Sequence, residues 1–541
     1  MQLKRDSPTD FVQALQAIED RADECFDNLR LYAIPKGRAS WGVLVSLVLR
    51  TEKERERHGY KDYDVILMNL SRWGTLVLRW VQQKGNEAKS ELQRYSWTRS
   101  LAEDVGVALS VAGSYDAFLS SFPMWHRDRM LAELCSDSTV RFVVPGGAPP
   151  RRVSAFHKGF MPVIKPVHDE GLVLTPDQER ERTDVVSQCF YAGDQAIAYP
   201  EPVALYRSLF PSYLGRLNAM FRRGDSVDLG PYTVGDLKRG YAALTTILSV
   251  HEDLCFRLGI RQQEYPVNSC VMMQTPDEWT GLVSRISDLG EKESAAIVDD
   301  LTLRDRFWDL HVQPFVPVDE NMLAVAPQFP LHSRPDENIL RVCGHRRRSY
   351  FDEASRLKEQ EMLDDLLPRC PTHFSPSGPV SLPSGLPNLD FLLVDEDSAT
   401  VLVAELKWLR KPHGWRERLE RDEDFKKGLR QLSDIKAFLA QNPSFLSDKG
   451  KLTRRLDQYA QVAFIVVARD HFAWPDVRDY IVADYEVFKQ RVSEAGSLSG
   501  FIDSLKSYDW LPVENTHFEV RFNPAGVNGV CVESEVFYRI P

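Results

Sequence analysis

Two short apolar runs joined by a polar loop place the tightest constraint on how this 541-residue chain folds. The runs are Phe391–Val394 and Val401–Leu406, and the loop between them begins with Asp395, Glu396 and Asp397. Apolar runs of this length, separated by so short a connection, predict two β-strands of an antiparallel hairpin. The three acidic residues are typical of a turn, and no chemistry is assigned to them.

The hairpin predicts which side chains share one face of the sheet. Pairing Val394 with Val401 across the loop puts Asp390 opposite Glu405. Opposed residues of an antiparallel pair have Cβ atoms about 5 Å apart on one face, and Lys407, two residues beyond Glu405, points to that same face. We therefore expect two carboxylates and an ammonium group together at the end of an apolar strand pair.

These three residue types together favour metal-assisted chemistry on a phosphate. Directly opposed carboxylates destabilise a sheet, and a cation between them removes that cost. Mg²⁺ accepts one or two protein carboxylates and fills its remaining positions with water and phosphate oxygens. Such an ion lowers the pKa of a bound water, and a neighbouring lysine can orient that water. Asp390, Glu405 and Lys407 are thus candidate catalytic residues, with Mg²⁺ or Mn²⁺ as the cofactor bound by Asp390 and Glu405.

Asp390, followed by Glu405-Leu406-Lys407, resembles the signature of the PD-(D/E)XK, or restriction-endonuclease-like, nuclease superfamily. The first half of the motif is Asn388-Leu389-Asp390, where a strict match has Pro-Asp. The resemblance covers roughly residues 345–490 and implies a core of helix, three-stranded meander, helix and strand, the last strand being Val462–Ala468.

The resemblance also implies residues on the two flanking helices. The family often has a glutamate on the helix before the hairpin, and on a helical wheel Glu361 extends the apolar face of Tyr350, whereas Glu359 falls on the far side. Glu361 is therefore the expected third metal ligand, and Glu353 is the second choice.

Some branches of the family place a glutamine on the helix after the lysine strand. Here Gln431 lies at the edge of that helix's apolar stripe. Gln431 is therefore the expected catalytic glutamine. Lys426, Lys427 and Arg430 on the same helix are expected to contact the nucleic-acid backbone.

The remaining sequence predicts a multidomain protein. Residues 1–300 form a mainly α-helical region with a break near 140–180, and 301–344 is an extended connecting segment. Residues 345–515 form the α/β restriction-endonuclease-like domain, and 516–541 form a C-terminal β-hairpin.

Two features outside the hairpin could also meet nucleic acid. Five tryptophans of the helical region could stack bases, although aromatic residues in helices more often fill the core: Trp41, Trp73, Trp80, Trp97 and Trp125. The run His345-Arg-Arg-Arg348 could bind phosphate, although such a run is more often the solvated start of a helix.

Composition excludes several classes of protein. A net charge of −11 does not fit a protein that coats nucleic acid, but an enzyme needs only a local basic surface. The eight cysteines include no CxxC pair, which argues against a zinc ribbon or a disulfide scaffold. The chain has no Gly-rich phosphate-binding loop, and its first residues lack the apolar core of a signal peptide. We expect a cytoplasmic protein that does not bind membranes.

The expected function is that of a Mg²⁺-dependent endonuclease. The resemblance favours DNA as the substrate, bacterial defence against phage as the context, and a homo-oligomer or a partner protein bound through the helical region. Two alternatives stay open: a nuclease-like module that binds nucleic acid without cutting it, and an assembly or sensor protein that works through its helical region.

Overall fold

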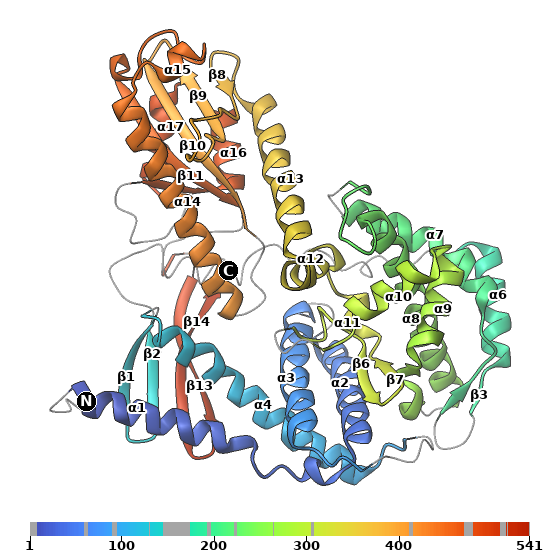
Figure 1. The fold of residues 1–541 in the computed structure, drawn as a ribbon. Coiled ribbons are helices and arrows are strands. Elements are labelled where there is room, and N and C mark those ends of the chain that lie inside the picture. The colour runs from blue at the N-terminus through green and yellow to red at the C-terminus, as the bar shows by residue number, and fades with distance from the viewer. Residues whose placement is uncertain are drawn as a thin grey trace.

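The computed structural model describes residues 8–58, 63–88, 95–128, 130–143, 174–191, 196–220, 224–262, 265–304, 308–409, 415–469, 480–508, 515–516 and 518–539. The chain forms an N-terminal body and a C-terminal α/β domain, joined by the long helix α13 (Arg348–Leu366) (Figure 1). The predicted division into a helical N-terminal half and a mixed α/β region is confirmed at this level.

The N-terminal body is mainly helical, as predicted. Its helices are α1 (Pro8–Asp23), α2 (Lys36–His58), α3 (Tyr63–Lys84), α4 (Arg99–Trp125), α6 (Pro176–Gln188), α7 (Val203–Met220), α8 (Val234–Gln262), α9 (Pro276–Ser287), α10 (Glu291–Asp300), α11 (Gln328–Leu331) and α12 (Pro335–Arg346). Its strands are β1 (Leu131–Ser136), β2 (Thr139–Val143), β3 (Phe190–Tyr191), β4 (Ile197–Ala198), β5 (Met272–Gln274), β6 (Val316–Asp319) and β7 (Met322–Val325).

Residues 301–344 are not an extended connecting segment, and that prediction is wrong. Strands β6 and β7 pair with β5 in a three-stranded sheet, and helices α11 and α12 follow. Phe315, Leu331 and Ile339 are buried in the same core as α8 and α9. The segment is therefore part of the body. The predicted break near 140–180 falls largely on residues 144–173, outside the described residues.

The predicted C-terminal hairpin is confirmed as β13 (Phe518–Val527) and β14 (Val530–Arg539). Asn528 and Gly529 form the turn with φ of 48° and 73°, the left-handed values that a tight two-residue hairpin turn requires. β14 then pairs in parallel with β2, which gives a four-stranded sheet of order β1-β2-β14-β13. The hairpin is therefore part of the N-terminal body (Figure 1).

Two hydrophobic cores stabilise the N-terminal body, one around α2, α3 and α4 and one around α8 and α9. Trp41 and Trp80 are buried in the first core, with exposed fractions of 0% and 5%. Trp73, Trp97 and Trp125 are partly buried and pack against it. Among the described residues α4 alone is long and apolar enough to span a membrane, and its buried side chains lie in this first core.

The C-terminal domain is built on a five-stranded sheet of order β12-β11-β10-β9-β8. Its strands are β8 (Ser375–Ser377), β9 (Phe391–Asp395), β10 (Thr400–Trp408), β11 (Gln461–Arg469) and β12 (Ile481–Asp484). Its other helices are α14 (Trp415–Gln441), α15 (Phe445–Asp448), α16 (Tyr485–Ser493) and α17 (Leu498–Lys506). The β8–β9–β10 pairs are antiparallel, whereas β11 lies parallel to both β10 and β12.

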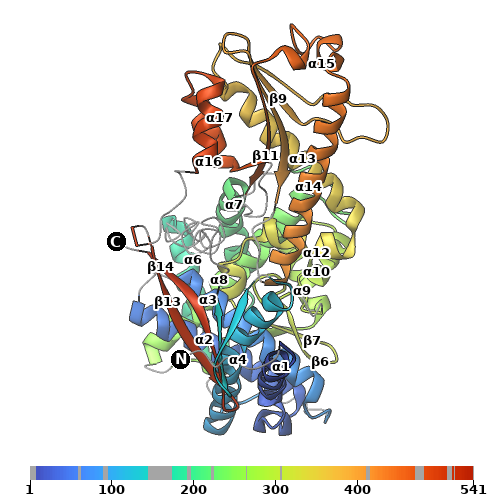
Figure 2. The same cartoon turned by 90° about the vertical axis from the view of Figure 1, so that its left-hand side faces the viewer.

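Both faces of this sheet are covered, which explains why its strands are almost uniformly apolar. Leu392 and Val403 pack with α14 on one face, while Leu393 and Leu402 pack with α16 and α17 on the other. Figure 2 shows α14 on one side of the sheet and α16 and α17 on the opposite side.

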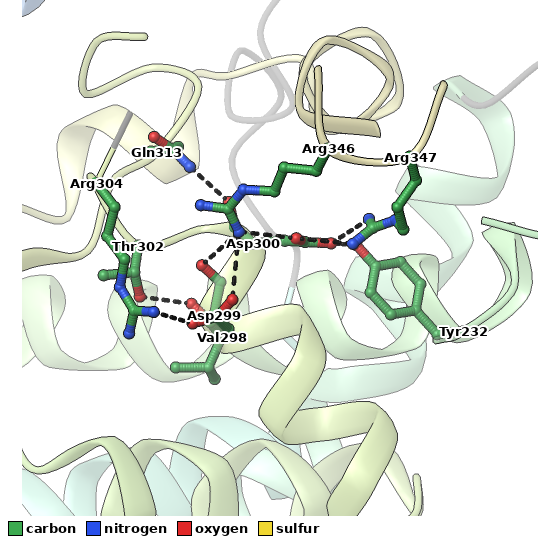
Figure 3. Close-up of polar contacts among 9 residues, drawn as sticks. All are labelled: Tyr232, Val298, Asp299, Asp300, Thr302, Arg304, Gln313, Arg346 and Arg347. Carbon is green, nitrogen blue, oxygen red and sulfur yellow. Dashed lines mark hydrogen bonds and ion pairs between the residues drawn. The ribbon is translucent and has the colours of Figure 1, made fainter. Parts of the chain in front are cut away.

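The junction between α12 and α13 is held by an ion-pair network around the buried Asp300 (Figure 3). The Asp300 side chain is only 2% exposed and accepts hydrogen bonds from Arg346, Arg347 and Tyr232. Arg346 also pairs with Asp299 at 3.2 Å. These two arginines of the 345–348 run therefore serve the fold, because their charges offset a buried carboxylate.

Candidate active site

The hairpin has the predicted register. β9 and β10 pair Val394 with Val401 and Leu392 with Val403, and the pairing ends at Phe391. Asp390 lies one residue before β9, so it continues the face of the sheet that Leu392 and Val394 present to α14. Glu405 and Lys407 alternate onto the same face.

A backbone hydrogen bond orients the Asp390 carboxylate. The Leu406 N–H donates to Asp390 Oδ2 at 2.9 Å, which ties the end of β9 to β10 beyond the last strand pair. The Asp390 carboxyl also lies within hydrogen-bonding distance of the Glu405 carboxyl.

Glu405 and Lys407 form an ion pair inside the domain. Glu405 is 1% exposed, and Lys407 Nζ lies 2.7 Å from Glu405 Oε1. Glu405 Oε2 is buried and has no hydrogen-bond donor among the described residues. A buried, unpartnered carboxylate oxygen is costly in a folded protein, and this one requires a ligand or a proton. The burial of both side chains distinguishes this pair from an ordinary ion pair on an exposed hairpin.

Helix α14 covers the pair through a glycine. A Cβ at Gly428 would lie 3.0 Å from Lys407 Cε and 3.2 Å from Lys407 Cγ, so any larger residue would displace the lysine. Glycine inside a helix costs about 1 kcal/mol, and its presence often marks such a close approach. Gln431 lies three residues later on the same side of α14, and its Oε1 is buried without a hydrogen-bond partner among the described residues.

The acidic residue that α13 contributes is Glu359, and the prediction of Glu361 is wrong. The Glu359 carboxylate lies near Lys407 and Asp390 and accepts a hydrogen bond from the Trp408 backbone N–H. Glu361 instead pairs with Lys358 and is 45% exposed. The helical wheel that predicts Glu361 includes Tyr350 in the inward face, but Tyr350 is 38% exposed and does not mark that face. Glu353, the second choice, pairs at the surface with Arg356.

The basic residues predicted on α14 lie at different distances from the site. Lys427 is exposed but near enough to Glu359 to influence its pKa. Lys426 forms an ion pair with Glu423 at 2.7 Å, and Arg430 is exposed. Lys427 is therefore the one of the three that the structure brings near the acidic cluster.

Burial and mutual repulsion favour the protonated acids. Burial raises the pKa of Glu405 to about 8, with Asp390 and Glu359 adding to the rise and Lys407 opposing it. Burial also raises the pKa of Asp390, against the opposing effect of Lys407. Burial lowers the pKa of Lys407, but the Glu405 and Glu359 carboxylates outweigh this effect and raise it above its usual value. The lysine therefore stays charged.

The donor set fits a hard divalent cation. It offers two adjacent carboxylates, one of them with an unpartnered oxygen, and Mg²⁺ needs no more than one or two from the protein. No group of three His, Cys, Asp or Glu side chains with metal-binding geometry occurs among the described residues. Asp390 and Glu405 are thus the metal-binding candidates, with Glu359 on the lysine's side of the site.

Comparisons of the chain with protein-family models, with curated proteins and with solved structures find no match.

Proposed function

We propose that the chain is a metal-dependent nuclease that hydrolyses phosphodiester bonds, with DNA as its substrate. The observation that carries the proposal is the placement of Asp390, Glu405 and Lys407 on one sheet face, where Glu405 Oε2 is buried and has no hydrogen-bond partner among the described residues. A site of this kind combines metal ligands with a fixed positive charge.

The order of elements around the site supports the same reaction class. A helix (α13), an antiparallel meander (β8–β9–β10), a helix (α14) and a parallel strand (β11) follow one another in the order expected of the PD-(D/E)XK superfamily. The acids and the lysine lie at the strand ends of the meander, where the resemblance expects them. Fold likeness alone does not fix an activity, so the proposal depends on the side chains.

Each residue has a distinct role in the proposed reaction. Asp390, held by the Leu406 N–H, and Glu405, through Oε2, would bind Mg²⁺ or Mn²⁺. The bound ion would polarise the scissile phosphate and lower the pKa of a water molecule. The Lys407 ammonium, held in place by Glu405 and covered by Gly428, would orient the attacking water and offset the charge that develops on the phosphate.

Neighbouring groups complete this assignment. The unpartnered Gln431 Oε1 would accept a hydrogen bond from the same water, and Glu359 would keep Lys407 protonated. The exposed Lys427 on α14 would meet the nucleic-acid backbone next to the site.

A cleavage assay with a matched control tests the proposal. Full-length protein is incubated with plasmid, linear and single-stranded DNA and with RNA, in Mg²⁺, Mn²⁺ or EDTA. We expect metal-dependent cleavage that Lys407→Ala reduces by about 10²-fold or more. Lys451→Ala, which removes an exposed lysine of the same domain, should leave cleavage unchanged. Turnover near wild type in Lys407→Ala, or no cleavage of any substrate by the wild type, would contradict the proposal.

A further inference from the structure

A cationic cavity lies in the N-terminal body, apart from the proposed active site. Its volume is about 430 Å³, within the range typical of small-ligand sites. Helices α2 and α3 supply its lining: Arg50, Lys53, Glu54, Arg57, Ile66, Asn69, Leu70 and Trp73. These two helices lie in the body below α13, whereas the active-site strands lie beside the upper part of α13 (Figure 1).

The charge of this cavity contrasts with that of the whole chain. Three of its side chains are cationic and one is acidic, in a protein of net charge −11. Arg57 is paired with Glu54 at 3.2 Å. Within the described part of the chain, Arg50 and Lys53 form no ion pair. Two cations that form no ion pair, in a concave site with only one acidic side chain in its described lining, favour an anionic ligand.

Arg50 is positioned at the cavity by α4. Its Nη2 donates to the Gly106 carbonyl at 3.3 Å, a long hydrogen bond that leaves its other N–H groups for a ligand. Burial lowers the pKa of Arg50, whereas Glu54 opposes this effect. A partly desolvated guanidinium binds phosphate oxygens more strongly than a fully hydrated one, because less water must be removed.

Helix α3 supplies an aromatic ring and apolar side chains to the lining of the cavity. The Trp73 indole packs against Gly113 of α4, where a Cβ would lie 3.3 Å from the indole ring atoms Cδ2 and Cε2. Ile66 and Leu70 add an apolar surface, and the Asn69 side chain adds a donor and an acceptor. An indole held in this way provides a surface on which a planar ring can stack.

We infer that this cavity binds a mononucleotide. The phosphates would contact Arg50 and Lys53, the base would stack on Trp73, and Asn69 would bond to the edge of the base. Neither inorganic phosphate nor a nucleoside uses both halves of the cavity, so each binds more weakly than a nucleotide. The inference does not depend on the proposed nuclease activity.

Fluorescence anisotropy of MANT-ATP, a fluorescent ATP analogue, tests the inference with the full chain in EDTA. EDTA removes divalent ions, so the proposed metal site cannot bind the probe through a cation. We expect saturable binding with a Kd below about 1 mM, weakened about tenfold in Lys53→Ala, since a charge-assisted hydrogen bond is worth that much. Lys53 is exposed, so its loss should leave the fold intact. Trp73→Leu should weaken binding as well, with thermal melting used to verify folding.

Two variants serve as controls for the location of the site. Lys292→Ala removes an exposed lysine at the start of α10, and Glu405→Gln alters the proposed active site. Both should bind MANT-ATP as the wild type does. Equal weakening in Lys292→Ala and Lys53→Ala would overturn the assignment, because it would mean that the probe responds only to overall charge.

Competition identifies the ligand class. ATP or AMP should displace the probe at a concentration about tenfold below that of inorganic phosphate or adenosine. Equal displacement by phosphate would overturn the inference in favour of a simple anion site. Oligo(dT) could also displace the probe at a concentration, counted in nucleotides, below that required of ATP. This result would overturn the inference in favour of a surface for single-stranded nucleic acid. No saturable binding of the probe would overturn it outright.

Discussion

Replacing Glu405 by glutamine tests the electrostatics of the proposed active site without invoking its activity. Burial raises the pKa of Glu405 from an ordinary value of 4.5 to about 8. The folded protein therefore holds a proton there that the unfolded chain releases, and the free energy of unfolding falls as the pH rises between these two values. Glutamine mimics the protonated acid and should not show this loss.

The size of the effect follows from the two pKa values. One pKa unit corresponds to about 1.4 kcal/mol, so the wild type should lose about 3 kcal/mol relative to Glu405→Gln between about pH 5.5 and about pH 8. For a domain of this size, the gap in Tm between the two proteins should then widen by roughly 6–12 °C. The variant should be the more stable protein at the higher pH.

Thermal melts of both proteins in EDTA at the two pH values measure this gap. Asp434→Asn neutralises an exposed acid on α14, and its Tm should change between the two pH values as that of the wild type does. Mn²⁺ at the higher pH should narrow the gap, because the ion binds the ionised wild-type site and stabilises the folded state by mass action. A gap of equal size at both pH values would refute the reasoning, since it would mean that Glu405 is ionised in the folded protein throughout.

Three further substitutions test the arrangement of the site and of the junction. Glu359→Gln should lower the cleavage rate by about tenfold or more, whereas Glu361→Gln should leave the rate within about twofold of the wild type. Equal effects of the two substitutions in the cleavage assay would contradict the assignment of Glu359 as the α13 residue of the site. Asp390→Asn should raise the Tm of the metal-free protein but lose most of the Mn²⁺-induced rise, and an equal rise in variant and wild type would place the ion elsewhere. Asp300→Ala leaves two arginines without their buried carboxylate and should destabilise the protein by about 3 kcal/mol, whereas the exposed-pair variant Arg348→Ala should cost less than about 1 kcal/mol, as measured by thermal or urea unfolding.

The hairpin of the site could be predicted residue by residue because the sequence features that determine its register lie within the hairpin itself. Two apolar runs and a short polar loop fix the register, and the two-residue period then fixes the face on which Glu405 and Lys407 lie. The close approach of α14 had a local signal as well, the glycine at position 428 within a helix.

The inward face of α13 could not be predicted from a single wheel because the helix packs against two cores. Ala354 belongs to the second core of the N-terminal body, whereas Met362 and Leu366 belong to the core of the α/β domain. A helical wheel drawn over the whole helix mixes these two faces. It therefore predicts Glu361 instead of Glu359 as the inward acid. The parallel pairing of β14 with β2 could not be predicted either, because the sequence of one strand does not indicate which distant strand pairs with it.

This pairing also sets an order of events during synthesis. Arg141 on β2 forms an ion pair with Glu533 on β14, a residue made 392 positions later. The ribosome therefore completes the α/β domain between them before the sheet of the N-terminal body can close. Until then β2 has an unpaired edge, which is the kind of strand edge that recruits other chains. A nascent chain of this protein would need that edge shielded for as long as the intervening domain takes to emerge.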